Sequence, residues 1–370
     1  MKKFLLCLLI LVFSASLMLV GISCKGSTTA TSAAETSAAA AETSAAETTA
    51  AATSSPVAGE QENYIIYSGG WGDEIVQEWA WGGWLAEKYW NSKGDNIKVE
   101  WSGPNKWVAE EYISGLEAAI AKKPTGILVF PPNLGEDQML ADYYNSGGLL
   151  AGLNGSKGNF PVDFVVGTDG FAMGTIMAQV AIQLAGETFD VLAIGSLVNE
   201  AVASRHRGMD SVWSKYPGIK TVQLENQQAT KEETAALAAA MIAAHPDAKV
   251  LVAPSSFGGA AFAMACKEAG LNPGDKIIIA TDKDEELLNY IDEGWIQYTI
   301  SQNFPLETFY GISNLHLMKM HSINLSTDDA KALGRQLPGP MIVTTTMQAI
   351  GKEATQYYRN IKPPEGFPGV

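Results

Sequence analysis

The sequence predicts an α/β protein built from two doubly wound lobes, each with a parallel sheet. Short, nearly uninterrupted apolar segments alternate with helical stretches such as VAEEYISGLEAAIA (108–121) and EETAALAAAMIAAHP (232–246). Continuous apolar strands separated by helices are typical of parallel sheets covered on both faces. The ten candidate strands lie in roughly 300 residues, which suits two such lobes better than one.

The N-terminus predicts export. Lys2 and Lys3 precede an apolar run that ends at Ser23 and Cys24, as in a secretory signal over residues 1–23. The run V-G-I-S-C resembles a bacterial lipoprotein signal, although Gly21 stands where that class usually has Leu, Val or Ile. The resemblance implies that Cys24 carries a lipid, which anchors the protein to the outside of the cell membrane. The alternative is ordinary signal cleavage and release.

Residues 24–58 contain almost only Ser, Thr, Ala and Glu. Such a segment lacks the large apolar side chains that offset the entropy of ordering, so it is predicted to be a disordered tether.

Composition excludes several classes of function. The net charge of −15 argues against nucleic acid as a partner, because phosphates require a basic surface. Cys266 is the one cysteine beyond residue 24, and it is predicted to be a small buried apolar residue on a helix. No Cys/His cluster has metal-ligand spacing, and no phosphate-binding loop follows a strand, so neither metal nor cofactor is expected.

The elements can be placed in chain order from their apolar patterns. The predicted strands are 64–68, 97–101, 126–130, 149–153, 163–167, 190–195, 220–224, 249–253, 276–280 and 295–300. A helix is expected over 74–90, inside the stretch with four tryptophans between positions 71 and 84. Trp79 and Trp90 fall on its apolar stripe and are predicted to be core residues. Trp81 and Trp84 lie on another face, toward the lobe surface or a partner.

Polar residues directly follow several strands, where ligands bind in doubly wound folds. The segments TDKD (281–284) and SQNFP (301–305) follow strands, TDGFAMG (168–174) follows another, and VASRHRGM (202–209) lies before a predicted helix. Together they resemble the type 1 periplasmic binding proteins, in particular the ribose- and galactose-binding branch of sugar ABC transporters, over residues 64–345.

The resemblance implies two lobes joined by a hinge of three chain crossings, near 168–170, 301–305 and 338–343. Lobe 1 would comprise 59–168 plus 303–338, and lobe 2 would comprise 169–302 plus 339–350. Residues 351–370 would form a C-terminal tail.

The resemblance also implies residue roles. Asp282 accepts hydrogen bonds from sugar hydroxyls, Arg205 donates to sugar oxygens, and Gln302 lies at the hinge. Asn154-Gly155-Ser156 stands where the family has Asp-Arg, and Ser255-Ser256 stands where it has Asn-Asp. The first turn, SGGWGDE, departs as well, so the identity of the sugar stays open.

Each of these residues also has a structural alternative. Asp282 is a candidate helix cap, with Asp284 as the other candidate. Arg205 is a candidate for a surface or interlobe salt bridge, Gln302 for backbone contacts in the hinge, and Asp169 for a bond across the hinge. Trp71 and Trp107 follow strands and are expected to offer aromatic surfaces to the C–H face of a sugar. The full predicted ligand set is Trp71, Asn105, Trp107, Asn154, Asp169, Arg205, Ser255, Asp282 and Gln302.

The leading functional hypothesis is a monomeric, lipid-anchored solute receptor. It would close two lobes around a monosaccharide or small polyol and deliver it to an ABC permease in the membrane. One alternative keeps the fold but has the receptor bind a furanosyl autoinducer, or report to a sensor kinase or chemoreceptor. The other is an exported glycoside hydrolase, which needs two catalytic carboxylates across a pocket or a nucleophile with a base. A G-x-S-x-G motif is absent, and the enzyme reading is disfavoured.

Overall fold

The computed structural model describes residues 60–156, 158–228, 230–322 and 342–370. The predicted signal over 1–23, Cys24 and the tether over 24–58 lie outside these residues. Pro56–Val370 forms one compact unit that contains every described helix and strand, with its own cores, so it has the properties of an independently folding part. Within the described residues, no helix is long and apolar enough to cross a membrane.

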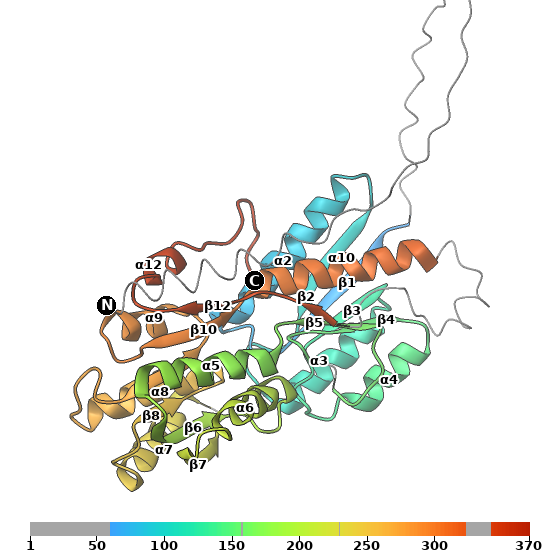
Figure 1. Ribbon diagram of the computed structural model, residues 1–370. Coiled ribbons are helices and arrows are strands. Elements are labelled where there is room, and N and C mark those ends of the chain that lie inside the picture. The colour runs from blue at the N-terminus through green and yellow to red at the C-terminus, as the bar shows by residue number, and fades with distance from the viewer. Residues whose placement is uncertain (1–59, 157, 229, 323–341) are drawn as a thin grey trace, which may run out of the picture. The chain divides into compact units, whose positions relative to one another are not determined.

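The first sheet belongs to lobe 1 and is parallel in all its strand pairs. Its strand order is β11-β5-β4-β3-β1-β2. The strands are β1 (Glu62–Tyr67), β2 (Ile97–Ser102), β3 (Gly126–Val129), β4 (Leu149–Gly152), β5 (Phe164–Gly167) and β11 (Ile342–Thr344). The helices of this lobe are α2 (Glu74–Asn91), α3 (Ala109–Ala121), α4 (Asp137–Asn145) and α10 (Phe304–Ser322). Helices α2 and α10 lie side by side against the sheet (Figure 1).

The second sheet belongs to lobe 2 and repeats the same winding, in the order β12-β10-β9-β8-β6-β7. Its strands are β6 (Thr188–Gly195), β7 (Gly218–Asn226), β8 (Val250–Val252), β9 (Ile277–Thr281), β10 (Tyr298–Gln302) and β12 (Met347–Ile350). Only β12 runs antiparallel to its neighbour. The helices are α5 (Gly170–Ala185), α6 (Glu200–Trp213), α7 (Lys231–Ala244), α8 (Ser256–Glu268), α9 (Glu285–Asp292) and the short α12 (Thr355–Tyr358). Two doubly wound lobes are therefore confirmed.

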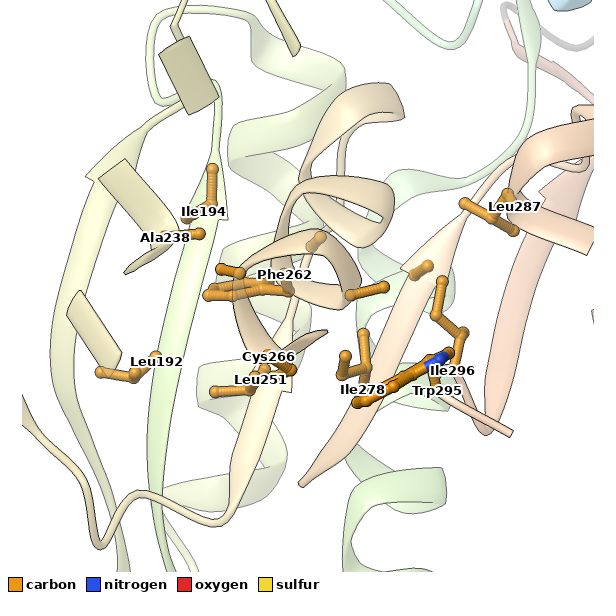
Figure 2. Close-up of a cluster of buried hydrophobic side chains, with 14 of the residues drawn as sticks. Leu192, Ile194, Ala238, Leu251, Phe262, Cys266, Ile278, Leu287, Trp295 and Ile296 are labelled. Atoms are coloured by element: carbon orange, nitrogen blue, oxygen red, sulfur yellow. The ribbon is translucent and has the colours of Figure 1, made fainter. Parts of the chain in front are cut away.

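Each sheet has an apolar core on both faces. In lobe 2, Phe262 and Cys266 of α8 pack with Leu251 and Ile278 of the sheet, together with Trp295 (Figure 2). Cys266 is 1% exposed, as expected for a small buried apolar residue, and burial raises the pKa of its thiol to about 11. A buried, protonated thiol of this kind is chemically inert.

Helix α2 forms where its apolar stripe predicts. Ile75, Val76, Trp79 and Ala86 are buried on one face. Gly82 lets α10 approach closely, because a Cβ there would lie 1.9 Å from the carbonyl oxygen of Pro305. The expectation that Trp79 is a core residue is confirmed by its 2% exposure.

The chain passes between the sheets at three places: Thr168–Asp169, Asn303 and Thr345–Thr346, each between elements of different sheets. The third crossing was expected at 338–343, with 339–350 wholly in lobe 2. That placement is wrong, because β11 pairs with β5 of lobe 1 and only β12 joins lobe 2.

Candidate functional site

The candidate site lies at the carboxyl ends of the parallel strands, near the position in each sheet where the strand order reverses. In lobe 1 this point falls between β1 and β3, and in lobe 2 between β6 and β8. Ligands of doubly wound folds bind at these switch points, because the loops there diverge to opposite faces of the sheet.

A chain of hydrogen bonds joins the two lobes through the hinge. The side chain of Gln302, at the end of β10, donates to Asn154 Oδ1 in the loop after β4. Gln302 Oε1 accepts from Arg205 Nη2 at 2.7 Å, and Arg205 Nη1 donates to the carbonyl of Pro254 at 2.7 Å. Three of the predicted ligand residues therefore meet in one network, although they are far apart in sequence.

Close packing of α5 against α6 fixes the position of Arg205. A Cβ at Gly174 would lie 1.8 Å from the carbonyl oxygen of Arg205, and a Cβ at Gly208 would lie 2.1 Å from that of Phe171. Two glycines of the predicted motifs thus permit the helix backbones to touch. Arg205 is 4% exposed, and its Nε has no hydrogen-bond partner. A buried donor without a partner is costly, which makes the Arg205 Nε a candidate for a hydrogen bond to a ligand.

Asp282 lies near enough to this guanidinium for the two charges to affect each other's pKa. It is 6% exposed and adopts φ +75, a left-handed conformation that non-glycine residues seldom take. Burial raises the pKa of Asp282 to about 6, and the neighbouring charge of Arg205 opposes the rise. Asp284, and not Asp282, caps α9, since its Oδ1 accepts from the Leu287 N–H at 3.0 Å. The capping alternative for Asp282 is therefore excluded.

Strained backbone recurs at the partner position in lobe 1. Asn154 follows β4 with φ +58, as Asp282 follows β9 with φ +75. Residues held in such conformations cluster at ligand sites, because the surrounding fold must supply the energy that holds them.

The two candidate aromatic surfaces differ in exposure. Trp71 is 4% exposed, belongs to the lobe 1 core and donates from Nε1 to the carbonyl of Ser102 at 2.9 Å. The expected platform role for Trp71 does not match this burial. Trp107 is 41% exposed; its ring lies over Gly69 and Gly70, and its edge meets Phe130 at a centroid distance of 5.4 Å. Trp107 thus presents an aromatic face at the switch point of lobe 1.

The remaining predicted ligand residues have local partners. Asp169 is exposed and caps α5 by accepting from the Ala172 N–H at 2.9 Å, so the side chain makes a local cap and not the alternative bond across the hinge. Ser255 is buried and donates to Gln227 Oε1 at 2.7 Å. Asn105 is exposed, and its backbone carbonyl accepts from the Gly72 N–H at 3.1 Å.

The structure adds one buried group beneath the hinge that the sequence pattern did not reveal. Glu307 of α10 is fully buried and accepts from Trp79 Nε1 at 3.1 Å. Its other oxygen accepts from the hydroxyls of Thr168 and Thr345 at 3.5 Å each. Burial raises the pKa of Glu307 to about 8, against the effect of the hydrogen bonds it receives. The first and third crossings thus converge on this carboxyl. The only hint in the sequence is an acidic residue on a helix that follows a strand.

A second missed group, His206, lies beside Arg205. Burial and the charge of Arg205 lower the pKa of His206 to about 4, and its Nε2 has no partner. The imidazole of His206 is therefore neutral near pH 7 and adds no second positive charge beside Arg205.

Comparisons with known proteins agree with this architecture. The sequence model described as the periplasmic binding protein domain matches residues 80–319. No curated protein matches the chain. Among solved structures, the sugar-binding protein of a sugar ABC transporter from Bacillus halodurans is similar, with a TM-score of 0.69, 19% identity, and coverage of 80% of this chain and 100% of that one.

Two proteins from Geobacillus stearothermophilus are similar in the same way. GanP, a glucose-galactose binding protein, has a TM-score of 0.68 and 17% identity, and covers 80% of this chain and 98% of its own. AraP, an arabinose binding protein, has a TM-score of 0.67 and 19% identity, with coverage of 81% and 99%. These likenesses show the fold, while the match over residues 80–319 shows the family. The chain belongs to the periplasmic binding protein family.

Proposed function

We propose that this protein is an extracytoplasmic, lipid-anchored receptor that binds a monosaccharide or small polyol between its lobes for an ABC importer. The observation that carries the proposal is the network of Asn154, Gln302 and Arg205, which spans both lobes and leaves the Arg205 Nε without a partner. The solved structures with the same fold are named for sugars, which supports this ligand class.

The chemistry of the site suits vicinal hydroxyls. Each hydroxyl donates once and accepts twice, so it needs an acceptor and a donor at fixed positions. Asp282 supplies the acceptor and Arg205 the donor, and both are held by a buried frame. Trp107 supplies an aromatic face for the apolar C–H side of a sugar ring.

Binding at this place is coupled to closure. A ligand that touches Asn154 in lobe 1 and Asp282 in lobe 2 stabilises the conformation in which both contacts exist, and a hinge of three short crossings permits this motion. The closed receptor would then present the solute to a permease as a monomer.

The test is a thermal-shift screen of residues 59–370 against aldopentoses, aldohexoses, their furanose forms, polyols and nucleosides. A sugar that binds the folded state raises the melting temperature, and the rise grows with the logarithm of its concentration relative to Kd. If no sugar or polyol shifts the transition while another solute class does, the proposed ligand class is wrong. Release of a hydrolysis product from a bound glycoside would instead favour the enzyme alternative.

Two variants locate the site by calorimetry with the sugar that the screen identifies. Asp282→Asn and Arg205→Lys each weaken a hydrogen bond to a charged group, so each is expected to cost about 1.5–3 kcal/mol, or more than tenfold in Kd. Lys267→Met removes an exposed ion pair with Glu293 elsewhere in lobe 2 and serves as the control with unchanged affinity. Unchanged affinity in both site variants would place the ligand elsewhere.

The proposed anchor has its own test. Cys24→Ser in the full chain is expected to abolish incorporation of labelled fatty acid and to release the protein from membranes. A variant that still incorporates the label would show that Cys24 is not the lipidated residue.

A further inference from the structure

Within the part of the chain that the structure describes, one ion pair joins the two lobes directly. Glu78 belongs to α2 of lobe 1, and Lys283 lies between β9 and α9 of lobe 2. Lys283 Nζ lies 2.6 Å from each carboxylate oxygen of Glu78. Their side chains are 9% and 8% exposed, so the pair is nearly removed from water.

This pair differs from the other ion pairs of Lys and Arg in the described part of the chain. Lys122–Glu100 and Lys267–Glu293 join residues within one lobe, and their side chains are about half exposed. Exposed pairs of that kind contribute little, because water screens them. Among the ion pairs of the described residues, Glu78–Lys283 is the one that joins α2 to lobe 2, and both of its side chains are shielded from solvent, so its charges interact more strongly.

A second connection joins the same two regions. After α12, Arg359 pairs with Glu285 and with Asp292 of α9, the latter at 2.6 Å. The chain then returns to lobe 1, where the Phe367 ring packs against Trp101 at 5.4 Å and against Trp84 of α2 at 6.1 Å between centroids. We call residues 359–367 the C-terminal strap. It gives Trp84 a partner within the chain itself.

Both connections run from α2 to α9 and the residues just before it. Glu78 and Trp84 lie on α2, while Lys283 and Glu285 flank the start of α9. We propose that the Glu78–Lys283 pair and the C-terminal strap form a clasp that holds the lobes together in the absence of ligand. Separation of the lobes would break a shielded ion pair and pull Phe367 from its aromatic contacts.

The clasp also bears on the binding site. Lys283 directly follows Asp282, and Glu78 lies close enough to affect the pKa of Asp282. The loop that carries Asp282 and its strained backbone is therefore held against lobe 1, because Lys283 is paired with Glu78 of α2. A protein that is already closed before ligand arrives loses less free energy in closing, which favours tight binding.

The test measures how far apart the two lobes lie in ligand-free Pro56–Val370, so it does not depend on which solute the protein binds. The radius of gyration from small-angle X-ray scattering, and the distance between probes placed on α4 and α7, report the opening. Removing one partner leaves a shielded, uncompensated charge. Glu78→Gln and Lys283→Met are thus each expected to shift the population toward an open form with a larger radius of gyration.

Charge exchange separates the clasp from a loss of folding. The double variant Glu78→Lys with Lys283→Glu restores the pair in reverse and is expected to return the wild-type radius of gyration. Lys267→Met is the control that leaves it unchanged. Wild-type lobe separation in both single variants would overturn the ion-pair part of the clasp, as would opening that the exchange does not reverse.

The strap has a matched pair of variants. Phe367→Ala removes the ring that contacts Trp84 and Trp101, whereas Val370→Ala changes a residue that is 53% exposed and lies three positions beyond Phe367, outside the strap. Opening in the first variant and not in the second supports the strap. Equal lobe separation in the two would overturn its role.

Discussion

Three tryptophans in lobe 1 have different surroundings, and their substitutions are expected to separate stability from binding. Trp79 is 2% exposed, and its ring packs against Phe304 at 4.9 Å. Trp79→Ala should cost about 3–5 kcal/mol of unfolding free energy by leaving a cavity. Trp71, buried at 4%, should behave in the same way. Trp107→Ala should leave the melting temperature almost unchanged and weaken sugar binding by about 1–3 kcal/mol, by analogy with base stacking on aromatic side chains.

Thermal melts and titration calorimetry of the three variants check this prediction. A Trp71→Ala protein that melts normally but loses affinity would restore the platform role expected from sequence. A position after a strand does not reveal whether a ring turns inward: Trp71 is buried in the lobe 1 core, whereas Trp107 is 41% exposed.

Glu307 predicts a pH dependence of stability. Its folded pKa of about 8 lies above the ordinary value, so the folded state holds a proton that the unfolded state has released. The resulting stability is complete below the ordinary pKa of 4.5 and is lost as pH rises through about 8. Glu307→Gln keeps a neutral polar group of similar shape. The melting temperature of Glu307→Gln minus that of the wild type should therefore increase from pH 5 to pH 9.

Comparing the wild type with Glu307→Gln isolates the titration of Glu307, because all other titratable groups are present in both proteins. The raised pKa of Asp282 also makes stability fall as pH rises. The lowered pKa of His206 acts in the other direction, since it makes stability fall as pH drops below the ordinary pKa of histidine. Parallel melting curves for wild type and Glu307→Gln across this range would show that Glu307 is ionised in the folded state.

At the scale of elements, the crossing of α5 and α6 connects packing to the site. Gly174→Ala would force a methyl group against the carbonyl of Arg205. We expect a loss of about 1–3 kcal/mol in stability from overpacking, together with a displaced Arg205 and weaker sugar binding. Gln179→Ala, on the exposed side of α5, is the control. Chemical denaturation and calorimetry measure the two effects, and a Gly174→Ala protein with wild-type values would show that the helices can separate freely.

The sequence predicted ten strands, and all ten exist, but it did not predict β11 and β12. Most of the ten have nearly continuous apolar segments, because buried parallel strands are covered on both faces, whereas the edge strands β2 and β7 also carry polar residues. Strands β11 and β12 have three and four residues, and each pairs with a neighbour on one side only. Their pairing depends on partners far away in sequence, and short edge strands carry little local pattern. The position of the third crossing was therefore misplaced.

At the scale of the whole folded unit, the predicted tether should be dispensable for binding. Deletion of residues 27–58 removes none of the residues that the structure describes, and these include every predicted ligand residue. Sugar affinity by calorimetry should stay within about twofold, because a disordered tether makes no contact with the site. A large loss of affinity would mean that the segment folds onto the lobes.

The network around Arg205 was partly predictable, because strand ends in this fold converge whatever their separation in sequence. The clasp was not. Glu78 and Lys283 are 205 positions apart, and each looks like an ordinary surface charge in its local sequence. Nothing in a helical pattern tells which charged residue will face another lobe, so long-range ion pairs between lobes become visible only once the fold is known.

The pairing of β11 with lobe 1 and of β12 with lobe 2 has a consequence for biosynthesis. The last strand of each sheet comes from residues 342–350, near the end of the chain. A growing polypeptide that lacks these residues has two sheets with open edges, and it also lacks the strap. Neither lobe can reach its final form during most of synthesis. For an exported protein, this delay favours passage through a narrow translocation channel, since folding finishes on the far side of the membrane.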